Sequence, residues 1–133
     1  MEEYRQLQIK LTPQRIAILD YLKDNKMHPS AEDIYGMVKK KFPTMSFATV
    51  YNTLEALRDK GKIRELKLDS TKRRYDPDIS NHYHLICTKC NEIRDVYKTL
   101  KIDTSNSMFH GYTKLGTNVE FFGLCPKCSI NNG

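Results

Sequence analysis

Apolar residues recur every three or four positions in three segments of the N-terminal half, a spacing that predicts three helices. The first helix follows Thr12-Pro13, a pair that suits the cap and the first position of a helix. The second follows Ser30, which opens a capping pattern, and we expect the three lysines at 39–41 in its last turn. The apolar faces of these two helices comprise Ile16, Leu19, Leu22, Ile34, Tyr35 and Val38.

The third segment predicts a helix that begins after Ser46 and ends near Lys60, before Gly61. The side expected in the core comprises Phe47, Val50, Leu54 and Leu57. The opposite side comprises Ala48, Asn52 and Glu55, with Thr49 and Tyr51 on its flanks. This helix therefore has an apolar face for the core and an outer face that could meet a partner.

After the third helix the pattern changes to that of short strands. Residues 62–68 and 73–76 predict a hairpin, joined by a turn at 69–72. Three helices followed by a basic hairpin are the layout of a winged helix-turn-helix domain. In that domain the third helix reads base edges in the major groove of DNA.

A domain boundary is expected near residues 77–81. The elements predicted beyond it are two strands, a helix and a last strand, at 82–88, 92–97, 103–109 and 118–125. The predicted fold class is α+β. A winged helix-turn-helix domain spans residues 1–78, with a hinge at about 77–81, and a small α/β domain spans residues 82–133.

Positive charge is concentrated between Lys39 and Asp76. This segment holds eleven Lys or Arg and five Asp or Glu, and its balance of +6 equals the net charge of the whole 133-residue chain. A basic segment of this kind suits a polyanion, with nucleic acid as the first candidate. A solvated protein surface is the alternative that charge alone leaves open.

The four cysteines form two Cys-x-x-Cys pairs, Cys87 with Cys90 and Cys125 with Cys128, and no cysteine is left over. The N-terminus has no signal-peptide pattern, and no segment is apolar over the length of a bilayer. We therefore expect a cytoplasmic protein without a membrane partner, whose thiols stay reduced. Two such pairs then predict a tetrahedral structural zinc site, with redox-active pairs or disulfides as alternatives.

Histidines and carboxylates point to a second metal site with harder ligands. His82 and His84 are one residue apart on a predicted strand, so both rings face the same side. The nearby carboxylates are Asp76, Asp78, Glu92 and Asp95. Such ligands suit Mn²⁺ or Fe²⁺ better than four thiolates do. His28, in a loop between helices, would tie the two halves together as a switch if it joined the site, although a lone loop histidine is more often polar surface.

Other protein classes explain less of the sequence. An enzyme with a catalytic zinc would need motifs that do not occur here, such as the His-x-Glu of zinc deaminases or the His-Glu-x-x-His of metalloproteases. A zinc-ribbon interaction module would explain the cysteines but not the basic hairpin. We therefore expect a DNA-binding protein that is not an enzyme.

Several motifs together resemble the ferric uptake regulator (Fur) family. The motifs are LTPQR at 11–15, HPSAE at 28–32, SFATVYNTL at 46–54, RYD at 74–76, HYHLICTKC at 82–90 and CPKC at 125–128. The resemblance spans nearly the whole chain. It implies a winged-helix domain, a C-terminal dimerisation domain, and a homodimer that represses transcription from a palindromic A·T-rich operator in double-stranded DNA.

Within the family the chain looks most like the peroxide-sensing branch. That likeness implies one structural Zn²⁺ per chain, and one Fe²⁺ or Mn²⁺ held by His28, Asp76, His82, His84 and Asp95. It also implies that peroxide, the only small-molecule signal expected, oxidises His28 and His82 and so releases metal and DNA. Iron-sensing relatives typically carry glutamate at the position of Asp95, and an iron-responsive repressor of iron-uptake genes is the alternative.

A further metal site found in many members is not expected, because residues 115–124 contain no histidine. The remaining histidine, His110, is interpreted as surface. The residues predicted to contact DNA are Lys10, Arg15, Thr49, Tyr51, Asn52, Arg73 and Arg74. Among them Tyr51 and Asn52 are chosen for the major groove, the two hairpin arginines for phosphates, and Lys10, by resemblance, for the minor groove. For each residue, phosphate contact without base readout is the alternative.

Overall fold

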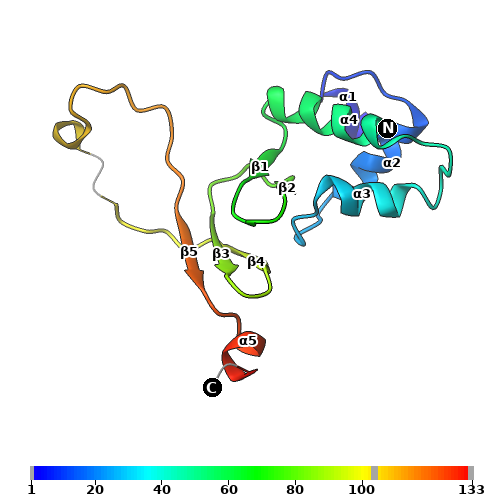
Figure 1. The fold of residues 1–133 in the computed structure, drawn as a ribbon. Coiled ribbons are helices and arrows are strands. Elements are labelled where there is room, and N and C mark those ends of the chain that lie inside the picture. Colours follow the sequence, from blue (N-terminus) through cyan, green and yellow to red (C-terminus); the bar gives the residue numbers. More distant parts are fainter. Residues whose placement is uncertain (1, 103–104, 132–133) are drawn as a thin grey trace. The chain divides into compact units, whose positions relative to one another are not determined.

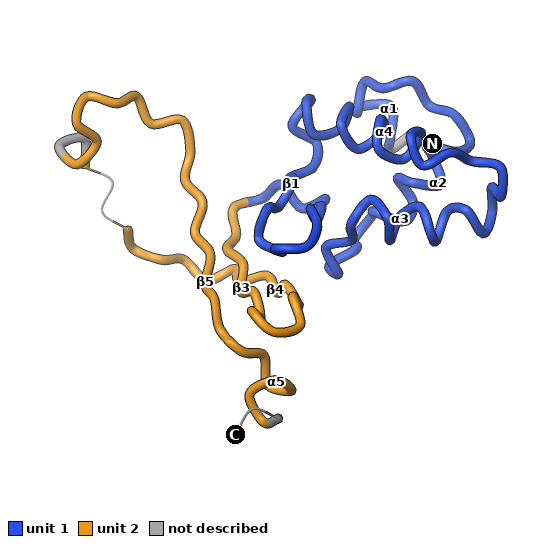
Figure 2. The backbone as a smooth tube through the Cα atoms, viewed as in Figure 1, with its two compact units in different colours: residues 1–80 blue, residues 81–133 orange. Residues whose placement is uncertain are grey.

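The computed structural model describes residues 2–102 and 105–131 (Figure 1). The chain divides into two compact units, residues 1–80 and 81–133 (Figure 2). Unit 1 is mainly helical and ends in a hairpin, whereas unit 2 is built on a small sheet. The predicted α+β class is therefore confirmed.

In unit 1, a short helix that the sequence analysis did not predict precedes the three expected helices and the hairpin. The elements are α1 (Glu2–Arg5), α2 (Pro13–Leu22), α3 (Ala31–Val38), α4 (Phe47–Asp59), β1 (Arg64–Leu66) and β2 (Arg74–Asp76). The two strands pair antiparallel, with Glu65 opposite Tyr75. They are shorter than predicted, but both lie within the predicted ranges.

Side-chain caps begin each of the three long helices where the sequence predicts. The Thr12 hydroxyl accepts a hydrogen bond from the first turn of α2, and the Ser46 hydroxyl does the same for α4. Ser30 forms a full capping box, because its hydroxyl accepts from the Asp33 amide at 3.1 Å while the Asp33 carboxylate accepts from the Ser30 amide at 3.0 Å. These contacts satisfy amide groups that a helix start otherwise leaves unpaired.

The end of α3 differs from the prediction. The helix stops at Val38, so the lysines at 39–41 lie at and beyond its C-cap rather than in its last turn. The amides of Lys41 and Phe42 both donate to the Val38 carbonyl, which turns the chain at this point. The turn brings Phe42 back against the apolar core, and this burial outweighs continuation of the helix.

The core of unit 1 lies where the three long helices meet. Its fully or almost fully buried side chains include Ile18, Leu19, Leu22, Ile34, Val38, Val50, Leu54 and Leu57. Phe47 was expected among them, but its side chain is 39% exposed. It is the first residue of α4, and its ring meets Tyr35 edge-on at 5.6 Å instead of entering the core.

Unit 2 contains a three-stranded sheet in the order β4-β3-β5. Its elements are β3 (Tyr83–Cys87), β4 (Ile93–Val96), the 3-10 helix η1 (Asn106–Phe109), β5 (Glu120–Gly123) and α5 (Pro126–Asn131). Strand β3 pairs antiparallel with β4 and parallel with β5. Of the helix predicted at 103–109, residues 103–104 lie outside the described residues, and the rest contains only the 3-10 turn. Helix α5 was not predicted.

Large apolar side chains remain on the surface of unit 2. They include Leu85, Phe121, Phe122, Leu124 and Ile130. An exposed apolar set of this size on a small sheet is typical of a protein-protein interface. Among the helices that the structure describes, none combines the length and the hydropathy needed to cross a membrane.

Truncating Leu54 tests the core of unit 1. We expect Leu54→Ala to lower the free energy of unfolding by about 2–5 kcal/mol, because the side chain is completely buried. Chemical denaturation of the full chain measures this loss. The matched control is Leu115→Ala, since Leu115 is 96% exposed and should change stability by less than about 0.5 kcal/mol. Equal losses in the two variants would contradict the assignment of the core.

Candidate metal centres and nucleic-acid interface

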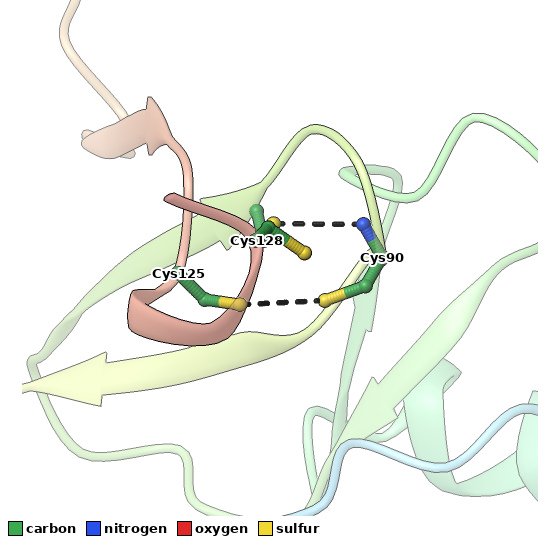
Figure 3. Close-up of side chains that lie close together, drawn as sticks. Cys90, Cys125 and Cys128 are labelled. Atoms are coloured by element: carbon green, nitrogen blue, oxygen red, sulfur yellow. Dashed lines mark hydrogen bonds between the residues drawn. The ribbon is translucent and has the colours of Figure 1, made fainter. Parts of the chain in front are cut away.

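Sheet pairing brings the two Cys-x-x-Cys pairs together within unit 2. Cys87 ends β3 and lies opposite Gly123 of the parallel strand β5, two residues before Cys125. The Thr88 amide donates to the Gly123 carbonyl at 2.9 Å and holds this register just before the turn that carries Cys90. Figure 3 shows the sulfurs of Cys90 and Cys125 facing each other, with Cys128 of α5 beside them.

The spacing of the four sulfurs fits a tetrahedral metal. All four lie within 4.8 Å of one another, and the Sγ atoms of Cys90 and Cys125 are 3.8 Å apart. Zinc-thiolate bonds of about 2.3 Å place two sulfurs of a tetrahedron about 3.8 Å apart. A disulfide needs about 2.05 Å, and all four cysteines are free thiols. The four cysteines therefore form a candidate zinc site, as predicted.

The electrostatics of this cluster also favour a cation. The Cys90 amide, followed by that of Cys125, lowers the pKa of the Cys87 thiol to about 6. The pKa of Cys128 is raised to about 12, first by its contact with the Cys125 thiol and then by burial. One cysteine of the cluster is thus stable as a thiolate, whereas ionisation of further thiols requires a positive charge nearby. A divalent cation supplies it, since the thiolate is the form that binds metal.

A second ligand set lies at the other end of β3. His84 is directly opposite Asp95 of β4, and alternation along β3 places His82 on the same face. The Nε2 atoms of His82 and His84 lie 3.3 Å and 3.5 Å from the same Asp95 oxygen, Oδ1. All three side chains are nearly or completely buried.

These distances fit ligands of one ion. They exceed the usual 2.7–3.2 Å of an N–H···O hydrogen bond. Two ligand atoms bound to one metal at about 2.1 Å lie about 3.0 Å apart at a right angle and about 3.4 Å apart at the tetrahedral angle. The histidine nitrogens and the shared carboxylate oxygen therefore offer one face of a metal site of mixed nitrogen and oxygen ligands.

In unit 1, His28 and Asp76 form a buried pair. The His28 Nε2 atom is 3.6 Å from the Asp76 Oδ2 atom, and both side chains are almost completely inaccessible to solvent. The view of His28 as polar surface is therefore wrong. Asp76 Oδ1 accepts a hydrogen bond from the Asp78 amide, and the Asp78 carboxylate instead accepts from Ser80 in the following turn.

The remaining ligand candidates have other positions. The Glu92 carboxylate accepts from the Arg94 guanidinium at 3.0 Å on the surface of unit 2. His110 is exposed, in agreement with its interpretation as surface. Tyr97 was missed by the sequence analysis, and its ring stacks on His82 at 5.1 Å. The signal was available, because Tyr97 follows Asp95 by two residues, a spacing that places both on one face of a strand.

Helix α4 carries three of the seven residues predicted to contact DNA, Thr49, Tyr51 and Asn52. Tyr51 and Asn52 are exposed on its outer face, while Thr49 is half-buried and its hydroxyl lies 3.1 Å from that of Ser46. Near α2, the guanidinium of half-buried Arg15 donates to the carbonyl of exposed Lys10 at 3.0 Å. The two basic residues are therefore neighbours in space.

The two arginines of the hairpin differ sharply. The side chain of Arg73 is 54% exposed and contacts the Glu65 carboxylate, which also binds Arg58 of α4 at 2.6 Å. The side chain of Arg74 is 12% exposed and binds Asp69 at 3.0 Å. The expectation that both face DNA phosphates therefore fits Arg73 but does not fit Arg74, whose guanidinium is engaged inside unit 1.

Comparison with known proteins identifies the family. The sequence model of the ferric uptake regulator family matches residues 6–122. The chain belongs to the ferric uptake regulator family. Curated members similar to it are transcription regulators, so the expectation that the chain is not an enzyme is confirmed by its family.

The chain is similar to curated proteins that are named as peroxide regulators. It is 37% identical to the peroxide operon regulator of Bacillus subtilis (strain 168) over 131 residues, which cover 97% of this chain and 90% of the relative. It is also 37% identical to the peroxide-responsive repressor PerR of Staphylococcus aureus (strain Mu50 / ATCC 700699) over 126 residues, which cover 93% of this chain and 85% of the relative.

Solved structures of the family have the same fold. The ferric uptake regulator of Francisella tularensis with iron is 28% identical, with a TM-score of 0.72 over 92% of this chain and 96% of that one. A structure described as the basis for peroxide sensing and gene regulation by PerR from Streptococcus pyogenes is 34% identical. Its TM-score is 0.52 over 96% of this chain and 88% of that one.

Substituting one thiol tests the zinc site. We expect Cys90→Ser to lose zinc and to unfold unit 2 at a lower temperature, because a serine hydroxyl does not ionise near neutral pH. Zinc content by mass spectrometry and thermal unfolding of the full chain measure both effects. Thr88→Ser is the matched control, since it changes a side chain two residues away, outside the cluster, and should retain zinc. One tightly bound zinc per chain in Cys90→Ser would contradict the assignment.

Zinc binding is also expected to depend on pH. The pKa of Cys90 and that of Cys128 are both raised, so at pH 7 each thiol must release a proton when zinc binds. The apparent zinc affinity should therefore rise with pH, by about a hundredfold or more per unit around neutrality for two or more protons released. Competition with a chelator at several pH values measures this slope. A pH-independent affinity would argue against thiol ligands.

Proposed function

We propose that this chain is a metal-dependent repressor of peroxide-stress genes. It acts in the cytoplasm as a homodimer and binds a palindromic A·T-rich operator in double-stranded DNA. The observation that carries the proposal is the buried pair of histidines, His82 and His84, around one oxygen of Asp95. The likeness to proteins named as peroxide regulators supports the same function.

The proposed regulatory site combines the ligand sets of both units. It holds one Fe²⁺ or Mn²⁺ per chain through His28, Asp76, His82, His84 and Asp95. Three nitrogen and two oxygen ligands suit either ion, and an ion that prefers six ligands would still be able to bind peroxide. Because the ligands come from both units, their binding to one ion would restrict the orientation of unit 1, which carries the DNA-binding residues, relative to unit 2.

The zinc site has a structural role in this proposal. One Zn²⁺ per chain binds Cys87, Cys90, Cys125 and Cys128 within unit 2. Four thiolate ligands leave no open position on a tetrahedral ion, which is typical of structural rather than catalytic zinc. Zinc therefore stabilises the sheet that carries His82 and His84, and the regulatory ion carries the signal.

The peroxide response is proposed to occur at two of the buried histidines. An Fe²⁺ ion held by these ligands would catalyse the reduction of peroxide beside them. A ring carbon of His28 or His82 would lose its hydrogen and gain one oxygen atom from peroxide, so that the ring is oxidised by two electrons while peroxide is reduced and its second oxygen leaves as water. An oxidised ring is a poorer nitrogen donor, so the ligand set weakens, the metal is lost and the DNA is released.

DNA recognition is proposed to centre on the outer face of α4. Tyr51 and Asn52 are exposed there and would meet base edges in the major groove. Contacts to the backbone and the minor groove would come from Arg73, Arg15, Thr49 and Lys10. Dimerisation would place two such helices on the two halves of a palindrome, and the exposed apolar side chains of unit 2 support a second copy as the partner.

An iron-responsive repressor of iron-uptake genes is the second candidate. The likeness to the Francisella tularensis regulator solved with iron favours it. The two candidates share the fold, the zinc site and the DNA-binding surface, so only the chemistry of the regulatory site separates them. Asp95 is the position that matters most, because a longer glutamate there would move the carboxylate relative to the two histidines.

Metal dependence of DNA binding is the first test. Zinc-loaded protein should retain operator DNA in a gel-shift assay with Mn²⁺ and lose it without Mn²⁺. His84→Ala should abolish the response to Mn²⁺, because it removes a buried ligand candidate. His110→Ala is the matched control, since His110 is exposed and outside the site, and it should respond normally. Equal binding with and without Mn²⁺ would refute a metal-gated repressor.

Peroxide chemistry is the second test. Mild peroxide should add one oxygen atom to His28 or His82 in the iron form and leave the manganese form unchanged, as measured by peptide mass spectrometry. Asp95→Glu should reduce this oxidation in the iron form while zinc is retained. His110 is the internal control for general damage, because it is exposed to solvent. No added oxygen at either buried histidine would favour the iron-responsive candidate.

A further inference from the structure

The loop that carries His28 is held against the hairpin of unit 1 by backbone contacts. His28 itself has a positive φ of 53°, a conformation that a non-glycine residue adopts only when its surroundings stabilise it. The next residue, Pro29, accepts a hydrogen bond from the Tyr75 amide of β2 at 2.9 Å. The position of His28 is therefore set by β2, the strand that ends at Asp76.

The Arg74 side chain supports the same loop. Its guanidinium donates to the Met27 carbonyl at 3.0 Å and also to the His28 carbonyl. These carbonyls belong to the two peptide units that flank the Cα atom of His28, so one planar guanidinium holds the backbone on both sides of His28. A lysine could not reproduce this arrangement, because it carries a single donor group instead of a fork.

The opposite edge of the Arg74 guanidinium binds the turn of the hairpin. It donates to Asp69 Oδ2 at 3.0 Å, and Asp69 Oδ1 accepts from the amide and the hydroxyl of Thr71 at 2.8 Å and 2.6 Å. Burial alone would raise the pKa of Asp69, but the bonds from Thr71 and Arg74 hold it below its usual value. The carboxylate is thus charged, buried and fully engaged, a combination that favours one geometry.

We infer that Arg74 is a positioning residue that links the His28 loop to the hairpin turn, so that metal binding at His28 and Asp76 rigidifies the hairpin that contacts DNA. The inference rests on the proposed function and extends it to the route by which the signal reaches the DNA-binding surface within unit 1. Arg74 touches neither metal nor DNA in this role. It acts through the His28 carbonyl on one side and through Asp69 on the other.

The alternative role for Arg74 is direct phosphate contact, as at Arg73. The two roles differ in their dependence on salt. A residue that neutralises one DNA phosphate contributes about one unit to the slope of log affinity against log salt, whereas a positioning residue contributes nothing to it. They also differ for metal, since outer groups that orient a ligand typically change metal affinity by about 10- to 100-fold.

The experiment compares Arg74→Lys and Asp69→Asn with the unmodified full-length protein, all zinc-loaded. Arg74→Lys keeps the charge but loses the fork, and Asp69→Asn keeps the acceptor for Thr71 while removing the charge that binds Arg74. We expect both to weaken Mn²⁺ binding by about 10- to 100-fold. Electron paramagnetic resonance of free Mn²⁺ measures the affinity. Zinc content and the thermal midpoint should stay near those of the unmodified protein, which separates positioning from general damage.

DNA binding gives the second readout. Saturating Mn²⁺ should restore DNA affinity in Arg74→Lys. The salt slope should stay unchanged in Arg74→Gln, which removes the charge that a phosphate contact would need. In the unmodified protein Mn²⁺ should slow amide hydrogen exchange at residues 69–73, and in Asp69→Asn this protection should be lost. Arg73→Gln is the matched neighbour. It should lower the salt slope by about one and leave Mn²⁺ affinity unchanged.

Three results would overturn the inference. Mn²⁺ affinity of Arg74→Lys within threefold of the unmodified protein would remove the link to the metal. A salt slope lowered by about one in Arg74→Gln, with unchanged Mn²⁺ affinity, would assign Arg74 to phosphate. Equal protection of residues 69–73 in Asp69→Asn would remove the link to the turn. If the unmodified protein itself binds DNA independently of Mn²⁺, the proposed function fails and the inference with it.

Discussion

Burial of polar ligand groups is the constraint on which the structure depends. Each unit places imidazole and carboxylate side chains where water cannot reach them, His28 with Asp76 in unit 1 and His82 and His84 with Asp95 in unit 2. Such burial costs free energy unless the groups are compensated. The four thiols, of which only Cys87 is buried, are too close together to ionise all at once without a cation. These groups therefore lower the stability of the metal-free fold, and a metal bound at the same positions would restore it.

Local signals in the sequence predicted the starts of the helices, because a cap depends on two or three neighbouring residues. Thr12, Ser30 and Ser46 all act as predicted. The predictions for the end of α3 and for the position of Phe47 were wrong, because both features depend on packing against other segments of the chain. The ligand types could be recognised from the sequence, but the burial of His28 could not, since it results from contacts with a hairpin more than forty residues later.

The adjacent arginines of the hairpin show the same limit of prediction from local sequence. Neighbouring residues on an extended chain face opposite sides, so Arg73 and Arg74 could not both face one DNA backbone in the same way. Sequence alone does not say which of them turns inward. The structure decides it through Asp69, whose carboxylate is held by the turn and accepts from Arg74. Arg73 therefore supplies a surface charge, whereas Arg74 forms an ion pair inside unit 1.

The candidate histidine site depends on the candidate zinc site, whereas the zinc site does not depend on the histidine site. Strand β3 carries both, since it ends at Cys87 and begins directly after His82, with His84 in its first half. Zinc bound at the thiols would hold β3 beside β5, and the pairing of β3 with β4 places His84 opposite Asp95. Loss of zinc would therefore disturb the histidines, whereas loss of the regulatory ion would leave the thiol cluster intact. Under the proposed function, this order would let the regulatory ion be lost and bound again on a scaffold that stays folded.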